Sequence, residues 1–398
     1  MSRLKSSLLF AGFNAVALAL IFVVAELVLA AAGVHPYSGE ARLRVFDREE
    51  GAIADALDGV YAGLGARARK IRGTKLWTYV PANSEHYNAN SLGFRGPEPA
   101  PRTDPSELRI AVLGGSTVWG SMVADRDTMP ARLETVLRAA LPGRNIHVYN
   151  LGIEGFALEQ EIALAERLHE AIDPDALVFY DFFNDARLAY EGNFELPVFD
   201  KDEGTYLAEP QSPLWQHLGN AKEWLAGNSR VFRVIERAVR DLRSDPLPDA
   251  VFEERLSRLV AGYRERIAAI TAHERARGIP VWAFVQPSIV TKQRTTEVEQ
   301  GIYTEWIENY PGFDRFFVRG AQQVAAPGDA LPIFDLSGLF AAVGEPLYWD
   351  CAHVTPRANQ LIAEAIAAEL GAHLLRSASS GVPRDADRAR VEPVQDRV

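Results

Sequence analysis

The sequence predicts an α/β fold with three layers, α/β/α, in which helices cover both faces of a five-stranded parallel sheet. The first observation is a set of short apolar runs bounded by turn residues, as expected of buried parallel strands. These runs are 109–115, 146–152, 176–182, 281–287 and 332–338. The second observation is that helical patterns separate the runs, so that strands and helices alternate along the chain.

Four segments with apolar residues at helical spacing supply the expected helices of the two outer layers. They cover residues 128–141, 158–172, 252–277 and 356–375. Pro130 falls in the first turn of the first of these helices, where proline is tolerated. Thr355 is the expected N-cap of the last helix, because Pro356 then takes the first helical position.

The N-terminus predicts a membrane anchor. Residues 8–32 are apolar except for Asn14 and Glu26, and this run is long enough to cross a hydrocarbon core of ~30 Å as a helix. Arg3 and Lys5 precede the run, and no cluster of positive charge follows it closely. The positive-inside rule then leaves the N-terminus in the cytoplasm and the rest of the chain outside, as in a single-pass protein of a bacterial inner membrane.

The alternative to an anchor is a cleaved signal peptide with its cleavage site near residues 30–33. The apolar run is longer than the usual signal core of roughly 7–15 residues, which favours an uncleaved anchor. Glu26 is costly in lipid, and two interpretations of it remain open. It lies near the outer interface and reaches water, or it pairs with a partner helix of a membrane complex.

The chain divides into an anchor, a leader, an α/β domain and a tail. The leader is broken by prolines and is expected to pack on the α/β domain, whereas the polar, charged tail is expected to be disordered. Two insertions follow the carboxyl ends of strands, where open α/β sheets bind ligands, and they are expected to wall the site. The boundaries are 1–34 for the cytoplasmic stub and anchor, 35–107 for the leader, 108–375 for the α/β domain with insertions at 187–250 and 288–330, and 376–398 for the tail.

Composition excludes some classes of function. The net charge of −11 over 398 residues argues against a nucleic-acid partner, since phosphate binding needs clustered Lys and Arg. Cys351 is the single cysteine, so the chain forms no intrachain disulfide.

A serine follows two glycines where the first strand ends, in RIAVLGGSTVWGS (109–121). Glycines let the backbone turn and let a substrate approach, which places Ser116 at the mouth of a site. The Ser116 N–H would then point at an anion. Taken alone, Ser116 is better explained by a turn or a helix cap, because a hydroxyl is a weak nucleophile until a base takes its proton.

His353 is the candidate base. It lies in YWDCAHVTP (348–356), between the fifth strand and the last helix, with Asp350 three residues upstream. In a loop, that spacing lets the carboxylate fold back onto the imidazole, fix its tautomer and stabilise the imidazolium. Donors for an oxyanion are offered at two further strand ends, by the Gly152 N–H and the Asn184 side-chain amide. Asp350 and His353 have no third or fourth ligand at a suitable spacing, so we expect no metal, and no cofactor is indicated.

The order of these blocks resembles the SGNH/GDSL hydrolases, over residues 108 to 375. The resemblance implies a flavodoxin-like SGNH fold in which the serine attacks an ester, His acts as base and Asp orients it. The serine N–H, the glycine N–H and the asparagine amide would bind the oxyanion. These roles carry onto Ser116, His353, Asp350, Gly152 and Asn184.

Two residues depart from the family pattern and bear on substrate class. Gly115 replaces the usual Asp of the first block, and Phe182 replaces the usual Gly of the third, where it is expected to crowd or line the pocket. The leader stretch NSLGFRG (90–96) is similar to what precedes the domain in membrane-anchored bacterial members.

The resemblance implies a membrane-anchored serine ester hydrolase that removes acetyl or short acyl groups from an envelope carbohydrate or a lipid. If a sugar hydroxyl replaces water, the same site is that of an O-acyltransferase. A third interpretation is a catalytically idle structural subunit that meets a membrane complex through the anchor helix.

Overall fold

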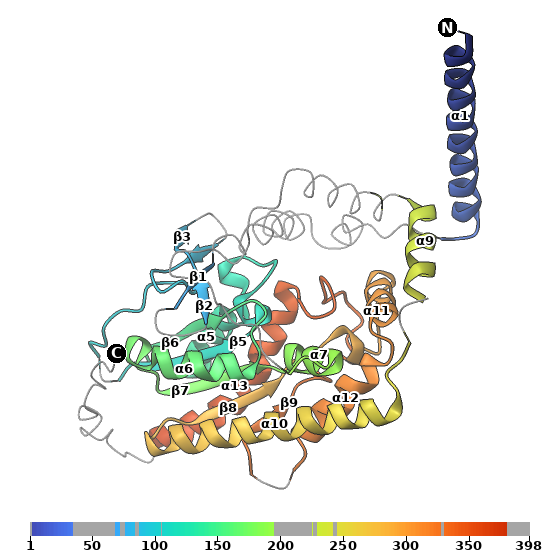
Figure 1. The fold of residues 1–398 in the computed structure, drawn as a ribbon. Helices are drawn as coiled ribbons and strands as arrows, with labels where there is room; N and C mark the ends of the chain where they lie inside the picture. The colour runs from blue at the N-terminus through green and yellow to red at the C-terminus, as the bar shows by residue number, and fades with distance from the viewer. Residues whose placement is uncertain are drawn as a thin grey trace, which may run out of the picture.

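The computed structural model describes residues 2–34, 68–71, 76–83, 87–104, 106–194, 225, 229–241, 245–327 and 330–379. Its centre is a five-stranded sheet in the order β6-β5-β7-β8-β9, in which all neighbouring strands are parallel (Figure 1). The strands are β5 (Leu108–Gly114), β6 (Ile146–Gly152), β7 (Ala176–Asp181), β8 (Val281–Val285) and β9 (Ile333–Asp335). The predicted five-stranded parallel sheet is therefore confirmed. The last two strands are shorter than expected; Pro287, which lacks an N–H, follows closely after β8.

Successive side chains of a strand point to opposite sides of the sheet, and here the side chains on both sides are buried. In β5, Ile110 and Val112 face one core, whereas Ala111 and Leu113 face the other, and all four are at most 1% exposed. This explains why the strands read as continuous apolar runs and not as an alternating pattern.

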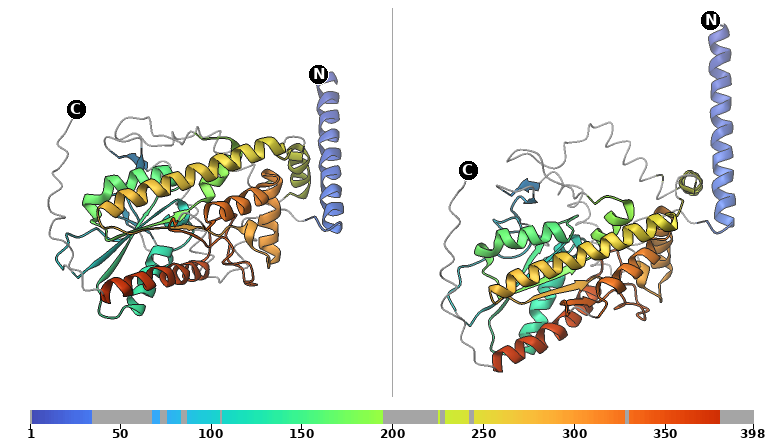
Figure 2. Two further views of the ribbon diagram at one scale, coloured as in Figure 1. Left: turned by 90° about the horizontal axis from the view of Figure 1, so that it is seen from below. Right: turned by 60° about the horizontal axis from the view of Figure 1, so that its bottom comes forward.

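Helices cover both faces, as predicted (Figure 2). One core is closed by α5 and α13, which contribute Leu133 and Ile362 among others. The opposite core is closed by four helices, α6, α7, α10 and α12. The bounds are α5 (Met129–Ala140), α6 (Leu158–Ile172), α7 (Phe183–Glu191), α10 (Asp249–Ala276), α12 (Phe313–Val324) and α13 (Pro356–Ser379).

The last helix begins where the sequence predicts and ends later. Thr355 Oγ1 accepts a hydrogen bond from the Ala358 N–H at 3.3 Å, as expected of an N-cap. The helix continues to Ser379, four residues into the predicted tail 376–398, and no glycine or proline occurs between the predicted end at 375 and Gly381. The rest of the tail lies outside the described residues.

The insertion at 288–330 contributes to a helical layer. It contains η3 (Ile289–Thr291), α11 (Glu297–Asn309) and α12. Five side chains of α12 are 0% exposed and belong to the core, so α12 is a component of the layer and not a cap; they are Phe313, Phe316, Phe317, Ala321 and Val324. Of the insertion at 187–250, the structure describes the end of α7, the helix α9 (Arg230–Asp241) and the start of α10, while 195–224, 226–228 and 242–244 lie outside the described residues.

The described part of the leader packs on the α/β domain. It forms two short antiparallel pairs, β1 (Ala68–Lys70) with β2 (Trp77–Tyr79) and β3 (Ala82–Asn83) with β4 (Asn88–Ala89). Trp77 meets Phe156 edge to face with ring centroids 4.8 Å apart, and Tyr79 lies 4.4 Å from the ring of Trp119. Residues 35–67, 72–75 and 84–86 lie outside the described residues.

The helix α1 (Ser2–Ala31) extends away from the rest of the protein (Figure 1). Ten of its large apolar side chains are exposed; they are Phe13, Val16, Leu18, Leu20, Ile21, Phe22, Val23, Val24, Leu27 and Val28. Within the described residues, no helix has both the length and the apolar character needed to cross a membrane. The side chains of residues 8–12, which the anchor prediction also uses, are not among those described.

Candidate active site

The nucleophile candidate stands at the carboxyl edge of the sheet. Strand β5 ends at Gly114, Gly115 follows in an extended conformation, and Ser116 opens the short helix α4 (Ser116–Trp119). This local geometry leaves the Ser116 N–H in the first turn of α4, without an acceptor inside the helix. The Ser116 side chain is half-buried at the surface of the domain.

The structure brings Ser116, His353 and Asp350 into one hydrogen-bonded chain. Ser116 Oγ lies 2.7 Å from His353 Nε2, although the two residues are 237 positions apart. His353 Nδ1 lies 2.6 Å from Asp350 Oδ2. An ionised carboxylate only accepts hydrogen bonds, so Nδ1 carries the proton and Nε2 accepts from the serine hydroxyl. This is the tautomer that a general base for Ser116 requires.

The loop that carries His353 is closed by its own backbone. The Trp349 N–H donates to the His353 carbonyl at 2.9 Å. Asp350 Oδ1 accepts from the backbone N–H groups of Ala352 at 2.9 Å and His353 at 2.7 Å, which leaves Oδ2 for the imidazole. Burial acts to raise the pKa of Asp350, but the charge of His353 and these hydrogen bonds outweigh it and hold the pKa well below its usual value. Asp350 is therefore ionised throughout the physiological range.

Asn184 lies beside the nucleophile, where the sequence expects an oxyanion donor. It is the second residue of α7, and its Nδ2 donates to the Phe156 carbonyl at 2.8 Å. A Cβ at Gly115 would lie only 2.7 Å from Asn184 Nδ2, so the amide passes directly over the residue before Ser116. One amide hydrogen is used by Phe156, and the second remains for a substrate oxygen.

Gly152 is not placed as the sequence predicts, and its assignment as an oxyanion donor is corrected. Its N–H donates to Asn150 Oδ1 at 3.0 Å, and Asn150 Nδ2 donates to the Val118 carbonyl at 2.8 Å. A Cβ at Gly152 would overlap the backbone of Val118 and Trp119. Gly152 therefore allows α4 to pack against β6, and its N–H is already used.

Gly155, in the turn after β6, is the other candidate for a backbone donor. Gly155 is exposed and has a φ of +76°, a conformation that favours glycine. The next residue, Phe156, holds Asn184, so this turn borders the nucleophile. No acceptor for the Gly155 N–H is found among the described residues. The sequence signal was present as a second glycine in NLGIEGF (150–156), within reach of the same strand end.

Phe182 does not line the site, contrary to expectation. It is fully buried, and its ring packs 5.4 Å from Tyr263 and 5.5 Å from Phe317. Its φ is +94°, in the region that favours glycine, so the backbone is strained here. The packing of the buried phenyl ring offsets this strain.

The leader supports the nucleophile helix through Arg95, a residue of the NSLGFRG stretch. Its side chain is 2% exposed, and it donates to the Gly120 and Val123 carbonyls at 2.5 Å each and pairs with Asp125 at 2.5 Å. Gly120 ends α4, so these bonds fix the segment that follows the helix. Sequence patterns did not reveal this role, because the partners of Arg95 are backbone carbonyls.

A second carboxyl group borders the site. Glu154 accepts from the Ser121 hydroxyl at 3.2 Å and from the Tyr79 hydroxyl at 3.3 Å. Burial raises the pKa of Glu154, and the charge of His353 lowers it in part. Tyr79 comes from the leader, so the leader, the turn at Gly155 and the end of α4 are joined at Glu154.

Buried carboxyl groups lie behind Asn184. Burial raises the pKa of Asp181 to about 8, the charge of Asp185 adds to the rise, and hydrogen bonds from Tyr263 and Glu161 lower it in part. Glu161 is 0% exposed, and its pKa is raised well above the usual value by burial and by the charges of Asp181 and Asp185. Among the residues that the structure describes, no group of three or more His, Cys, Asp or Glu side chains is placed to hold a metal ion.

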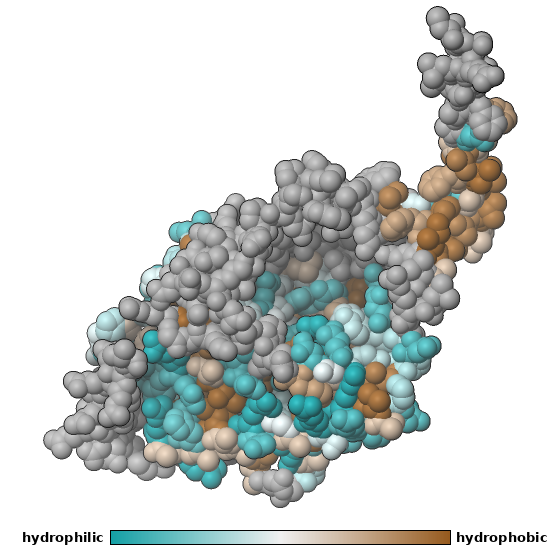
Figure 3. Space-filling view, viewed as in Figure 1, coloured by the Kyte–Doolittle hydropathy of each residue, from teal (hydrophilic) through white to brown (hydrophobic). Residues whose placement is uncertain are grey.

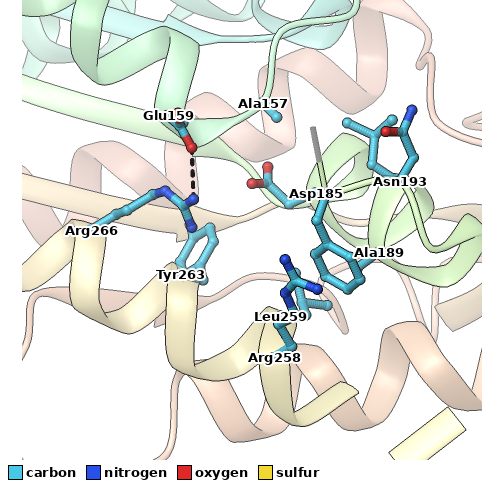
Figure 4. Close-up of a pocket in the computed structure, with 11 residues that line it drawn as sticks. Ala157, Glu159, Asp185, Ala189, Asn193, Arg258, Leu259, Tyr263 and Arg266 are labelled. Atoms are coloured by element: carbon cyan, nitrogen blue, oxygen red, sulfur yellow. Dashed lines mark hydrogen bonds and ion pairs between the residues drawn. The ribbon is translucent and has the colours of Figure 1, made fainter. Parts of the chain in front are cut away.

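Asp185, the residue after Asn184, lines a small pocket between α7 and α10 (Figure 4). Its carboxylate accepts from the Leu158 N–H at the start of α6, at 3.2 Å. At the rim of the pocket, Glu159 and Arg266 form an ion pair of 2.7 Å. Neither Ser116 nor His353 lines this pocket, so it is separate from the hydrogen-bonded chain above.

Comparison with known proteins gives fold-level likenesses only. The sequence matches no family model and no curated protein. Similar solved structures include an α/β hydrolase from the metagenome of Lake Arreo, Spain (15% identity, 66% of this chain and 95% of the other, TM-score 0.32). They also include a catalytic mutant of an acetylxylan esterase from Geobacillus stearothermophilus (14% identity, 66% of this chain and 94% of the other, TM-score 0.36). A third is a lipase/acylhydrolase from Enterococcus faecalis (17% identity, 67% of this chain and 96% of the other, TM-score 0.34). These TM-scores are low, so the function proposed below rests on the geometry of the site.

Replacing Arg95 by Met should destabilise the protein. The change leaves Asp125 and three carbonyls, those of Trp119, Gly120 and Val123, without the guanidinium, which costs about 3 kcal/mol in free energy of unfolding. Urea unfolding of the detergent-solubilised chain measures the loss. The matched control is Arg126→Met, whose side chain is 66% exposed and should change the stability by less than about 0.5 kcal/mol. Equal losses in the two variants would contradict the role of Arg95.

Replacing Asp181 by Asn should reduce the loss of stability at alkaline pH. The folded-state pKa of Asp181 is about 8, above the unfolded value of about 4. The stability from this group is therefore present below about pH 4 and is lost as the pH rises through about 8. The melting temperature, measured by circular dichroism at about pH 5 and about pH 9, should fall by roughly 5 °C less in the variant than in the wild type. The same fall in both proteins would show that Asp181 does not carry this linkage.

Proposed function

We propose that this chain is a serine ester hydrolase of the SGNH type. The observation that carries the proposal is the continuous chain from Asp350 through His353 to Ser116, with links of 2.6 and 2.7 Å. Stabilisation of a tetrahedral oxyanion requires hydrogen-bond donors, and the candidates are the Asn184 amide, which passes over Gly115, and the N–H groups of Ser116 and Gly155.

The reaction follows from this geometry. His353 Nε2 takes the proton of Ser116 Oγ as the oxygen attacks the ester carbonyl carbon, and Asp350 stabilises the imidazolium that forms. The negative oxygen of the tetrahedral intermediate is held by the N–H groups of Ser116 and Gly155 and by Asn184. The intermediate collapses, the alkoxide leaves with the proton from His353, and an acyl-serine remains. Water, deprotonated by His353, then releases the carboxylic acid.

The substrate class that we propose is an acetyl or short acyl ester on an envelope carbohydrate or lipid. The site opens at the surface: the His353 side chain is 23% exposed, that of Asp350 is 32% exposed, and Gly155 is exposed in its turn. A large, extended acceptor can therefore reach the hydroxyl without entering the core. The proposal does not extend to transfer onto a sugar hydroxyl, which needs an acceptor pocket that excludes water.

We also propose that α1 anchors the protein in a bacterial inner membrane, with the N-terminus in the cytoplasm and the α/β domain outside. The exposed apolar side chains from Phe13 to Val28 support this part of the proposal, since they leave no polar side of the helix for water. Arg3 and Lys5 give the orientation.

Labelling by an activated fluorophosphonate tests the enzymatic function. The wild type should label covalently, and Ser116→Ala should not, because the probe traps an activated serine hydroxyl. In His353→Ala the labelling rate should fall by about 10⁴-fold, since no base then takes the serine proton. Thr117→Ser, a change at the neighbouring hydroxyl, is the control and should label like the wild type. Failure of a folded wild type to label would favour the catalytically idle subunit.

A further inference from the structure

Glu26, the single acidic residue in the apolar run of α1, is bonded to a second helix. Glu26 Oε1 accepts from the Ser229 hydroxyl at 2.6 Å and from the Val231 N–H at 3.1 Å, and Oε2 accepts from the Arg230 N–H at 3.0 Å. These backbone donors belong to the first turn of α9, where a helix has no acceptors of its own and favours negative charge. Glu26 therefore caps α9 from another element of the same chain, and its charge is compensated.

Further contacts tie α9 to the end of α1. Arg230 Nε donates to the Val34 carbonyl at 3.0 Å, just beyond α1, and Arg230 Nη1 lies 3.8 Å from Glu26 Oε2. Figure 2, in its right-hand view, shows α9 end-on while α1 is seen from the side. The short helix thus lies across the end of the long one. Its other side approaches α11 of the α/β domain, so α9 connects the two.

The sequence of α9 has two sides. In RVFRVIERAVRD (230–241), a turn of 100° per residue puts the six apolar positions on one side of the helix and the six charged positions on the other. Four of the charged residues are arginines and two are acidic. Val234 and Ile235, on the apolar side, are 41% and 56% exposed, so the α/β domain leaves part of this side uncovered.

The apolar surface of α9 continues that of α1. Figure 3 shows apolar residues gathered over the part of α1 that lies nearest the α/β domain, next to α9. The exposed residues there include Leu27 and Val28, which directly follow Glu26 in α1. An apolar stripe with arginines on the opposite side, lying across a lipid-crossing helix, is the arrangement of helices that bind in the plane of a bilayer surface.

We propose that α9 is an interfacial helix that lies on the outer surface of the membrane crossed by α1, and that its partner is an anionic lipid surface. This inference rests on the anchor in the proposed function. Val234 and Ile235 enter the boundary between acyl chains and headgroups, and the arginines of α9 attract anionic headgroups. Glu26 then lies at the level of the interface, where it fixes α9 and, through α11, the height of the α/β domain above the lipid.

Depth-dependent fluorescence quenching of the full chain in vesicles tests this inference. A dye is attached at Ile235→Cys in a Cys351→Ser background. Two nitroxide lipids serve as quenchers, one with the nitroxide near the headgroup for position 235 and one with the nitroxide deep in the acyl chain for labels at the bilayer centre. We expect strong quenching at position 235. Adding phosphatidylglycerol to phosphatidylcholine vesicles should raise the ratio of bound to unbound α9 by about tenfold, because the helix carries a net excess of arginine. Equal quenching in the two lipid compositions would overturn the anionic partner.

Two matched label positions separate this inference from the anchor itself. Leu20→Cys reports whether α1 lies in the bilayer, and Gln322→Cys, on the exposed side of α12, reports a position away from it. If the label at position 20 is quenched but the label at position 235 is quenched no more than the label at position 322, the role of α9 is overturned and the anchor stands. No quenching at 20 would overturn both.

A variant of Glu26 tests the cap within the same assay. Glu26→Leu removes the acceptors of the Arg230 and Val231 N–H groups and leaves Ser229 Oγ, which accepts from the Phe232 N–H at 3.0 Å. We expect the bound fraction reported at position 235 to fall at least about twofold. Glu26→Gln keeps one acceptor oxygen and is the matched control, with a smaller loss. A full bound fraction in Glu26→Leu would show that Glu26 does not hold α9 at the membrane.

Discussion

The hydrogen bond between His353 Nε2 and Ser116 Oγ is the interaction on which the account of the site depends. It joins two residues that are 237 positions apart in the sequence, and its two atoms lie 2.7 Å apart. The parallel sheet makes this possible because all its strands end at one edge, so the residues after β5 and the loop that follows β9 emerge on the same side. The bond also requires an ionised Asp350, and the backbone donors of its own loop hold that charge in place.

Much of this arrangement is predictable from the sequence, because buried parallel strands are continuous apolar runs and each site residue follows one. Ser116, Asn184 and Asp350 all stand after such runs, and the structure places them together with His353. Gly152 fails for a specific reason. The turn beyond the strand determines which backbone N–H faces the site. The Gly152 N–H, which was expected to do so, donates to Asn150 Oδ1 instead.

Other features depend on contacts between distant segments, which periodicity does not encode. Arg95 and Glu26 look anomalous in the sequence, as a charge in an irregular leader and a charge in an apolar helix. Both are explained only by their partners, which are the carbonyls after α4 and the first turn of α9. Phe182 was expected at the pocket, but its positive φ turns the side chain into the core between Tyr263 and Phe317.

Peptide mapping by mass spectrometry, on protein quenched with acid during turnover of an activated acetate ester, tests the central claim most directly. The account predicts one acetyl group on the peptide that contains Ser116, formed quickly in the wild type. It also predicts that Asn184→Ala forms this acyl-serine about 10²-fold more slowly, because one oxyanion donor is lost. Turnover of the ester with the acetyl group on another residue, or with no acyl-protein at any time, would contradict it.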